Sequence, residues 1–445
     1  MEMILTYLTG MLPVLNLQFF GPTQTTLLND PGNDLSPENK TFYSKHLIDN
    51  AQPYLAYDQF GTKYPIPKNG GKTIEMRRFS PLKKALKSLN EGVTPVGNKL
   101  NVTFLTAKVE QYGDYIEHSD VLDMTAIDPI IVTSLDLLSS QAGRTLDTIT
   151  REVVCAGSNK TFAPRVNADG SKTEVLLRED VTTACKLTPE VIRKGVAKLK
   201  RHNAQPINGY FVAVIHPDVA CDIMGDREWI DAHQYTNVEN IYEGEIGRYA
   251  KVRFVESTEA KIIGPGYFWG DDATGGACRL TLHTALEAGG STKIVVEEAV
   301  SAAEAAELNA RITGGETVRM YVGGKLAEIV SVTAGDSGSA YFTTKVSVTD
   351  VPKGAMVCGY GAGKDGSAIY CTMLFAANAY GITDIEGMGL EHIVKQRGSA
   401  GTADPLNQRS TVGWKATKTA ERLVEEYMLR FEHSSDSYGA HAVSN

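Results

Sequence analysis

Residues 128–157 read DPIIVTSLDLLSSQAGRTLDTITREVVCAG, and this stretch has the most regular pattern in the chain. Asp128 and Pro129 are favoured at the N-cap and the first position of a helix, and Gly157 is typical just after a helix ends. Between them, apolar residues recur every three or four positions, at Ile131, Leu135, Leu138, Ala142, Leu146, Ile149 and Val153. The pattern predicts one helix of about 28 residues, about 40 Å long, which would cross a domain.

Before this helix, the sequence predicts a long two-stranded excursion. Residues 72–80 and 101–117 have the apolar and polar alternation of strands, and the stretch 81–99 between them is basic and irregular. A hairpin with so long a connection is marginally stable alone and normally needs a partner surface.

After this helix, strands and helices follow one another without a repeating βαβ period. We expect a second helix at 188–201, a buried strand at 210–215, a short helix from 216 to 225 and a strand at 251–255. In the short helix, His216-Pro217-Asp218 has the residue types of a helix start, which we favour over a catalytic pair. This mixture predicts an α+β fold.

The composition changes near residue 265. Short β runs around 293–296, 317–322, 328–332 and 341–348 are punctuated by Gly pairs, with one short helix near 301–308. They predict a β-rich module that ends in a Gly-rich hinge at 359–367. The chain then returns to a strand at 368–375, and the last amphipathic elements lie within 411–431.

The charge of the chain is unevenly distributed. The formal net charge of the 445 residues is −9, which argues against general coating of nucleic acid. Residues 61–100 alone carry nine Lys or Arg and two Asp or Glu, a local +7, so the rest of the chain carries −16. Such a basic segment can bind a polyanion or an acidic neighbouring copy of the same chain.

Neither a metal site nor a membrane segment is expected. The six cysteines are scattered without a C-x-x-C spacing, which indicates a reduced, intracellular chain, and no H-x-x-x-H pair suggests zinc. The apolar start at 3–20 contains Gly10, Pro13, Asn16 and Gln18, and no Lys or Arg precedes Lys40. We therefore interpret it as an arm rather than a signal peptide or a spanning helix.

Two short motifs suggest chemistry that their context does not support. Gly335-Asp336-Ser337-Gly338 matches the surroundings of a serine nucleophile, but Asp-Ser-Gly is also ordinary turn chemistry. The run 359–364 ends in Gly-Lys as a phosphate loop does, but Asp365 replaces the required hydroxyl. We interpret the first as a hairpin turn, the second as a hinge, and the pair Glu425 and Glu426 as a solvated face. No catalytic, cofactor-binding or metal-binding residue is assigned.

Several segments resemble the major capsid proteins of tailed double-stranded DNA bacteriophages. The resemblance covers residues 15–264 and 368–434, and 398–415 is its most specific part. The segments are LNLQFF at 15–20, GRY at 247–249, VRFVES at 252–257, NAYGIT at 378–383, GSAGTADPLNQR at 398–409, VGWK at 412–415 and YMLRFEH at 427–433.

The resemblance implies the tailed-phage capsid fold, α+β in class, with an added β-rich insertion domain. Its parts would be an N-terminal arm at 1–60, an extended loop at 61–119, a peripheral and axial core at 120–264 and 368–434 with the long helix as its spine, the insertion domain at 274–367 and a polar C-terminal tail at 435–445.

The resemblance also implies a function: a structural subunit, not an enzyme, of an icosahedral virion. Copies of it would self-assemble into hexamers and pentamers around phage DNA, without sequence-specific DNA binding, cofactor or membrane. Assembly would take place in the bacterial cytoplasm, with scaffold, portal or decoration proteins as further candidate partners. A cytoplasmic hydrolase with an appended β-sandwich-like module is the alternative.

The basic set of the excursion is the one candidate site. It consists of Arg77, Arg78, Lys83, Lys84 and Lys87. These residues could form a solvated loop, contact nucleic acid, or dock on an acidic neighbouring subunit. Aromatic residues that could stack on bases are few there, and the resemblance favours intersubunit docking.

Overall fold

The structure is a computed structural model in which two compact units are distinguished. It describes residues 56–79, 97–125, 130–167, 169–233, 247–270, 276–386, 390–395 and 406–445, isolated positions from 82 to 92, and the strands β1 (Thr25–Thr26), β2 (Asn29–Asp30) and β3 (Asn33–Asp34). One unit comprises 1–51, 112–142 and 390–416, and the other comprises 52–111, 143–389 and 417–445. Most of the predicted arm, including the LNLQFF segment, lies outside the described residues.

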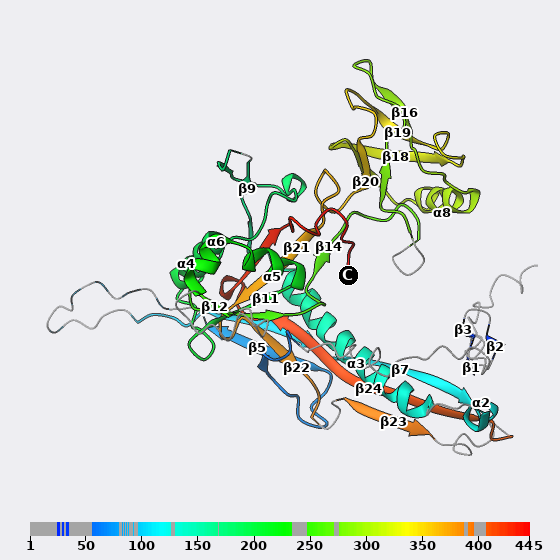
Figure 1. The fold of residues 1–445 in the computed structure, drawn as a ribbon. Helices are drawn as coiled ribbons and strands as arrows, with labels where there is room; N and C mark the ends of the chain where they lie inside the picture. The colour runs from blue at the N-terminus through cyan, green and yellow to red at the C-terminus, as the bar shows by residue number, and fades with distance from the viewer. Residues whose placement is uncertain are drawn as a thin grey trace, which may run out of the picture. The chain divides into compact units, whose positions relative to one another are not determined.

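The first unit is built on long strands and the first half of a long helix (Figure 1). Its elements are β7 (Glu110–Ser119), α2 (Asp120–Thr125), the start of α3 (Ile130–Cys155), β23 (Glu391–Lys395) and the start of β24 (Arg409–Arg422). β7 and β24 are neighbours in one sheet, and a Cβ added at Gly113 would lie 2.6 Å from the Trp414 carbonyl oxygen. The Trp414 indole donates to Gln141 on α3 at 3.2 Å, which joins helix and sheet.

The second unit has a seven-stranded sheet at its centre. The strand order is β12 (Arg248–Tyr249), β13 (Val252–Glu256), β11 (Phe211–Ile215), β21 (Ile369–Phe375), β25 (Met428–His433) and β8 (Lys160–Phe162), with β14 (Ile262–Ile263) also paired to β21. Every residue of β11, β21 and β25 is buried, as expected for central strands covered on both faces.

Three helices accompany this sheet: α4 (Pro189–Arg201), α5 (Pro217–Met224) and α6 (Arg227–His233). α4 packs closely on β25, because a Cβ at Gly195 would lie 2.2 Å from the Phe431 ring. The unit also contains smaller elements: β4 (Thr62–Lys63), β22 (Tyr380–Thr383), β9 (Arg165–Val166), β10 (Lys172–Thr173) and the 3-10 turns η3 (Arg178–Asp180) and η5 (Glu425–Tyr427).

The α+β class and most predicted elements are confirmed. The helix predicted at 188–201 is α4, the strand at 210–215 is β11, and α3 ends at Cys155, just before Gly157. Asp128 and Pro129, its expected start, lie outside the described residues. The single strand predicted at 101–117 is wrong. The structure has two strands, β6 (Val102–Lys108) and β7, which meet at the buried Val109.

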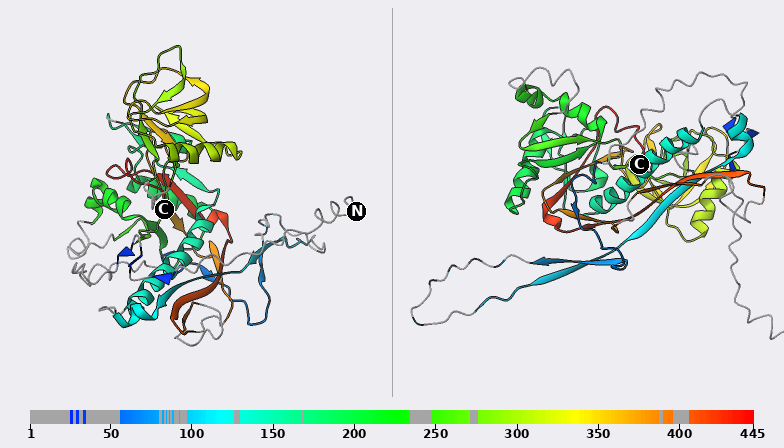
Figure 2. Two further views of the ribbon diagram at one scale, coloured as in Figure 1. Left: turned by 90° about the vertical axis from the view of Figure 1, so that its right-hand side faces the viewer. Right: turned by 90° about the horizontal axis from the view of Figure 1, so that it is seen from below.

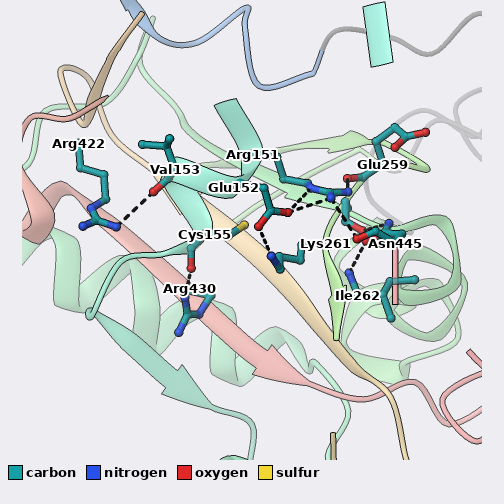
Figure 3. A network of polar contacts seen from close by, with 11 residues as sticks. Arg151, Glu152, Val153, Cys155, Glu259, Lys261, Ile262, Arg422, Arg430 and Asn445 are labelled. Carbon is teal, nitrogen blue, oxygen red and sulfur yellow. Dashed lines mark hydrogen bonds and ion pairs between the residues drawn. The ribbon is translucent and has the colours of Figure 1, made fainter. Parts of the chain in front are cut away.

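Charged side chains donate hydrogen bonds to the C-terminal end of α3 (Figure 3). The last carbonyls of a helix lack intrahelical partners. Here Arg422 donates to the Val153 carbonyl at 3.3 Å and Arg430 donates to that of Cys155. Nearby, Arg151 donates to the Glu259 carbonyl at 2.8 Å and to Asn445 at 3.1 Å. The predicted polar tail therefore contacts the core.

The region predicted to be an insertion has its own sheet and its own hydrophobic core. The strand order is β15 (Arg279–Thr281), β20 (Met356–Gly359), β17 (Arg319–Val322), β18 (Lys325–Thr333), β19 (Tyr341–Val348) and β16 (Ser291–Val295). α8 (Ala302–Thr313) starts with a capping box between Ser301 and Glu304. The predicted β runs and the short helix are thus confirmed.

The two chain segments that lead into and out of this region lie side by side. The Gly266 amide donates to the Tyr360 carbonyl at 3.2 Å, and a Cβ at Gly359 would lie 1.9 Å from the Gly266 carbonyl oxygen. The region's core begins at Phe268 and Trp269, ahead of the expected boundary at 274. Gly363, in the predicted hinge, packs against the Val181 carbonyl, with no room for a Cβ. The segment predicted as a hinge is therefore tightly packed against the core.

Replacing residues 267–359 with a short Gly/Ser linker should leave a soluble, folded remainder. The region has a separate core, and its two ends already lie together, so the linker needs to span only a short gap. Circular dichroism and thermal melting of several linker lengths would check this. Insolubility of every linker variant would show that the region is part of the main core.

Candidate functional site

The predicted excursion is a two-stranded antiparallel ribbon (Figure 2). It pairs β5 (Thr73–Phe79) with β6, from Thr73 opposite Lys108 to Phe79 opposite Val102. At its base Met76 and Ala107 are buried. The ribbon therefore packs into its own unit through these two side chains.

The far end of the ribbon exposes large apolar side chains. Phe79 and Phe104 are each 58% exposed, and Leu100 is 67% exposed. Leu82 and Leu86, in the connection between the strands, are also exposed. Exposed apolar side chains gathered on one element commonly mark a surface that another chain covers.

The basic residues accompany these apolar groups. The Arg77 guanidinium lies 5.7 Å from the centre of the Phe104 ring and pairs loosely with Glu75 at 3.6 Å. Lys84 is exposed, whereas Lys83 and Lys87 lie outside the described residues. The ribbon thus presents cations and apolar groups together, a combination suited to a protein surface with apolar and acidic groups.

Arg78 has a partner within its own chain, which the sequence did not predict. It donates to Glu426 at 3.1 Å, and both side chains are about half exposed. The backbone amide of Glu426 and the Arg78 guanidinium lower the pKa of that carboxyl. The neighbouring Glu425 accepts hydrogen bonds from the amides of Ser158 and Asn159. These two acids are therefore bound, not a freely solvated face.

The turn around Ser337 contains more polar chemistry than its sequence indicated. His283 pairs with Glu297, and its ring lies against Gly338, about 3 Å from a Cβ placed there. The Ser337 hydroxyl, however, donates to the Glu297 carbonyl at 2.6 Å. A serine nucleophile has to give its proton to the histidine, and here that proton is directed to a backbone oxygen.

We expect Ser337→Ala to lower the free energy of unfolding by no more than about 0.5 kcal/mol, because an exposed turn position tolerates truncation. Urea denaturation would measure this. Labelling of Ser337 by a serine-directed fluorophosphonate probe would contradict the interpretation as a turn.

The other sequence candidates have structural roles. His216 caps α5 by accepting from the Asp218 amide at 3.2 Å, and Pro217 is the first helical residue, as predicted. Lys364, in the run that resembled a phosphate loop, pairs with Asp180 at 2.9 Å. Within the described part of the chain, no cluster of three or more His, Cys, Asp or Glu could hold a metal ion. No helix among these residues is long and apolar enough to span a membrane.

No family model and no curated protein matches the chain. Among solved structures, it is similar to the capsid of cyanophage P-SCSP1u, at 10% identity and a TM-score of 0.48 over 84% of this chain and 86% of that one. It is also similar to the capsid of cyanophage Pam1, at 14% identity and a TM-score of 0.48 over 84% of this chain and 89% of that one. The head structure of Helicobacter pylori bacteriophage KHP40 is similar at 10% identity and a TM-score of 0.46, over 84% of this chain and 87% of that one. All three are phage head or capsid structures, the class of protein that the sequence resembles.

Proposed function

We propose that this chain is the shell subunit of a tailed-phage capsid, which self-assembles into hexamers and pentamers around double-stranded DNA. The observation that carries the proposal is the ribbon of β5 and β6, whose far end exposes Phe79, Phe104 and Leu100 beside Arg77 and Lys84. A two-stranded ribbon of this kind is marginally stable in water without a covering surface. A neighbouring subunit would provide one.

The charge distribution supports a second copy of the same chain as the covering surface. Residues 61–100 carry +7 and the remainder carries −16, so the ribbon of one subunit is attracted to the body of the next. The site residues of this contact are Arg77, Arg78, Lys83, Lys84 and Lys87. In this contact Arg78 would either leave Glu426 of its own chain and pair with an acidic group of the neighbouring subunit, or pair with both.

The rest of the assignment follows from the proposed shell. The insertion domain at 274–367 would be displayed on the exterior or would bridge subunits, and the arm at 1–60 would tie neighbours together. Scaffold, portal or decoration proteins would be further partners, and assembly would take place in the host cytoplasm before the subunit becomes part of the virion. DNA would be enclosed without sequence-specific contacts.

The alternative of a hydrolase has no support in the described residues. It would need a nucleophile that is bonded to its base, but Ser337 donates its proton to a backbone carbonyl. Sedimentation velocity of nuclease-treated protein separates the two functions. Stable pentamers, hexamers or larger particles support the shell subunit, whereas a compact monomer that turns over an ester substrate supports the hydrolase.

A further inference from the structure

A buried lysine and a carboxylate meet in the second unit. Lys418 on β24 contacts both carboxylate oxygens of Asp58, which lies in the turn before β4, and its Nζ is 2.6 Å from Oδ1. Lys418 also donates to the Leu146 carbonyl on α3 at 2.8 Å. The Thr150 hydroxyl, one turn further along α3, donates to the same Asp58 oxygen at 2.7 Å.

The surroundings disfavour a charged pair. The Lys418 side chain is 6% exposed and that of Asp58 is 23% exposed. Tyr57, Tyr380 and Phe375 belong to the apolar cluster around them. Moving two ions out of water costs several kcal/mol each, and their mutual attraction often fails to compensate. Burial lowers the pKa of Lys418, although Asp58 opposes this, and so favours the neutral amine.

A second acid lies in the same cluster. Asp147, one residue after Leu146, is 1% exposed and accepts from the Tyr57 amide at 2.9 Å through Oδ1. Its buried Oδ2 has no hydrogen-bond partner among the described residues. Burial raises the pKa of Asp147 to about 6, so this carboxyl can hold and release a proton near neutral pH. No role in the proposed shell uses it.

We propose that Lys418 and Asp58 become joined by an amide bond within the chain, with Asp147 as the proton carrier. The proposal is independent of the capsid assignment, because it uses only contacts inside one unit.

The reaction is a condensation that needs no other reactant. Lys418 gives one proton to the Asp58 carboxylate and attacks the Asp58 Cγ as a neutral amine, while Thr150 hydrogen-bonds to an oxygen of that carboxyl. The C–N bond forms and the nitrogen gives a second proton to Asp147. Asp147 passes this proton to the already protonated Asp58 oxygen, whose C–O bond breaks as the oxygen leaves as water. The ammonium and the carboxylate both disappear, so the net charge is unchanged, and the partly exposed side of Asp58 gives the water a way out.

A second close lysine–carboxylate pair shows why the contact alone is insufficient. Lys261 contacts Glu152 just as closely, but Glu152 is 44% exposed and also binds Arg151 (Figure 3). Water and a guanidinium keep that carboxylate ionised and poorly electrophilic. We therefore expect Lys261 and Glu152 to remain an ordinary ion pair, and Lys261→Arg is the matched control.

The test is the intact mass of the denatured full-length protein. The expected mass is lower than the sequence mass by one water, and a protease digest should contain a branched peptide that joins residues 58 and 418. Lys418→Arg, which keeps the charge but forms no amide here, and Asp147→Asn should both show the full sequence mass. Lys261→Arg should still show the loss of one water.

Each contrary outcome overturns part of the proposal. Full sequence mass for the wild-type protein rules out the bond, whether or not any variant folds. Loss of water that persists in Lys418→Arg places the modification elsewhere. The branched peptide in Asp147→Asn at wild-type yield would remove Asp147 from the reaction.

Discussion

Changing Arg77, Arg78, Lys83, Lys84 and Lys87 together to Glu should give a folded, soluble subunit that no longer assembles. The change reverses the charge of the ribbon, so that attraction to an acidic neighbour becomes repulsion. Each exposed ion pair contributes only about 0.2–1 kcal/mol, but a ring of subunits repeats the contact at every interface. Sedimentation and electron microscopy of nuclease-treated protein would measure the loss.

A control variant and a measurement of DNA retention distinguish docking from an effect of net charge and from contact with DNA. Reversing Lys200, Arg201, Lys251, Arg253 and Lys353, which are exposed and lie outside the ribbon, changes the net charge by the same amount and should permit assembly. If both variants fail alike, net charge and not the ribbon is responsible. If the ribbon variant forms normal shells and fails only to retain DNA, the basic set contacts nucleic acid and the docking role is wrong. Salt sensitivity alone would not discriminate, because DNA contacts are also screened.

We expect a large loss of stability when Glu432, which is fully buried on β25, is replaced by alanine. Its carboxylate accepts from Arg178 at 2.8 and 2.7 Å and from Arg430 at 2.9 and 2.7 Å. Glu432→Ala would leave the buried Arg430 without its acidic partner, and breaking such a buried network costs about 3–5 kcal/mol. Urea denaturation would measure the loss in the free energy of unfolding.

An exposed pair of similar geometry provides the control. Arg311 donates to Glu316 at 2.9 and 2.7 Å on the surface near the C-terminal end of α8. Glu316→Ala should therefore cost far less than Glu432→Ala, because water screens the pair and solvates the arginine that remains. Equal losses for the two variants would show that burial does not determine the contribution of the Glu432 network.

The Glu432 network also predicts a pH dependence. Burial alone would raise the pKa of Glu432, but Arg178 and Arg430 outweigh it and lower the pKa below the usual value of 4.5 for a glutamate side chain. A carboxyl with a lowered folded-state pKa stabilises the fold above its unfolded pKa, and this contribution is lost as the pH falls through the folded value. The wild-type protein should thus lose more stability than Glu432→Ala when the pH is lowered from about 5 to 3.

The sequence predicts those elements whose signal is local. α3 and α4 have apolar stripes that a helix period explains, and the capping residues of α8 are adjacent in the chain. β11 is a short apolar run bounded by turn residues. In each case residues close together in the chain determine the secondary structure, and tertiary packing stabilises the same structure.

The parts that the sequence did not predict depend on residues far apart in the chain. Arg78 and Glu426 are separated by 348 positions, and Arg178 and Glu432 by 254. No periodicity links such pairs, so each residue alone resembles an ordinary surface charge. The break at the buried Val109 has a similar origin, because the strands on its two sides have different partners. β6 pairs with β5, whereas β7 lies beside β24 in another sheet, and this change of partner divides one alternating run into two strands.

If copies of this chain build a closed shell, negative-stain electron microscopy of the purified, nuclease-treated protein should show it. We expect rings of five and six subunits, or closed icosahedral particles that retain no DNA after treatment. Single compact particles at every protein concentration and salt condition, with or without scaffold protein, would contradict it.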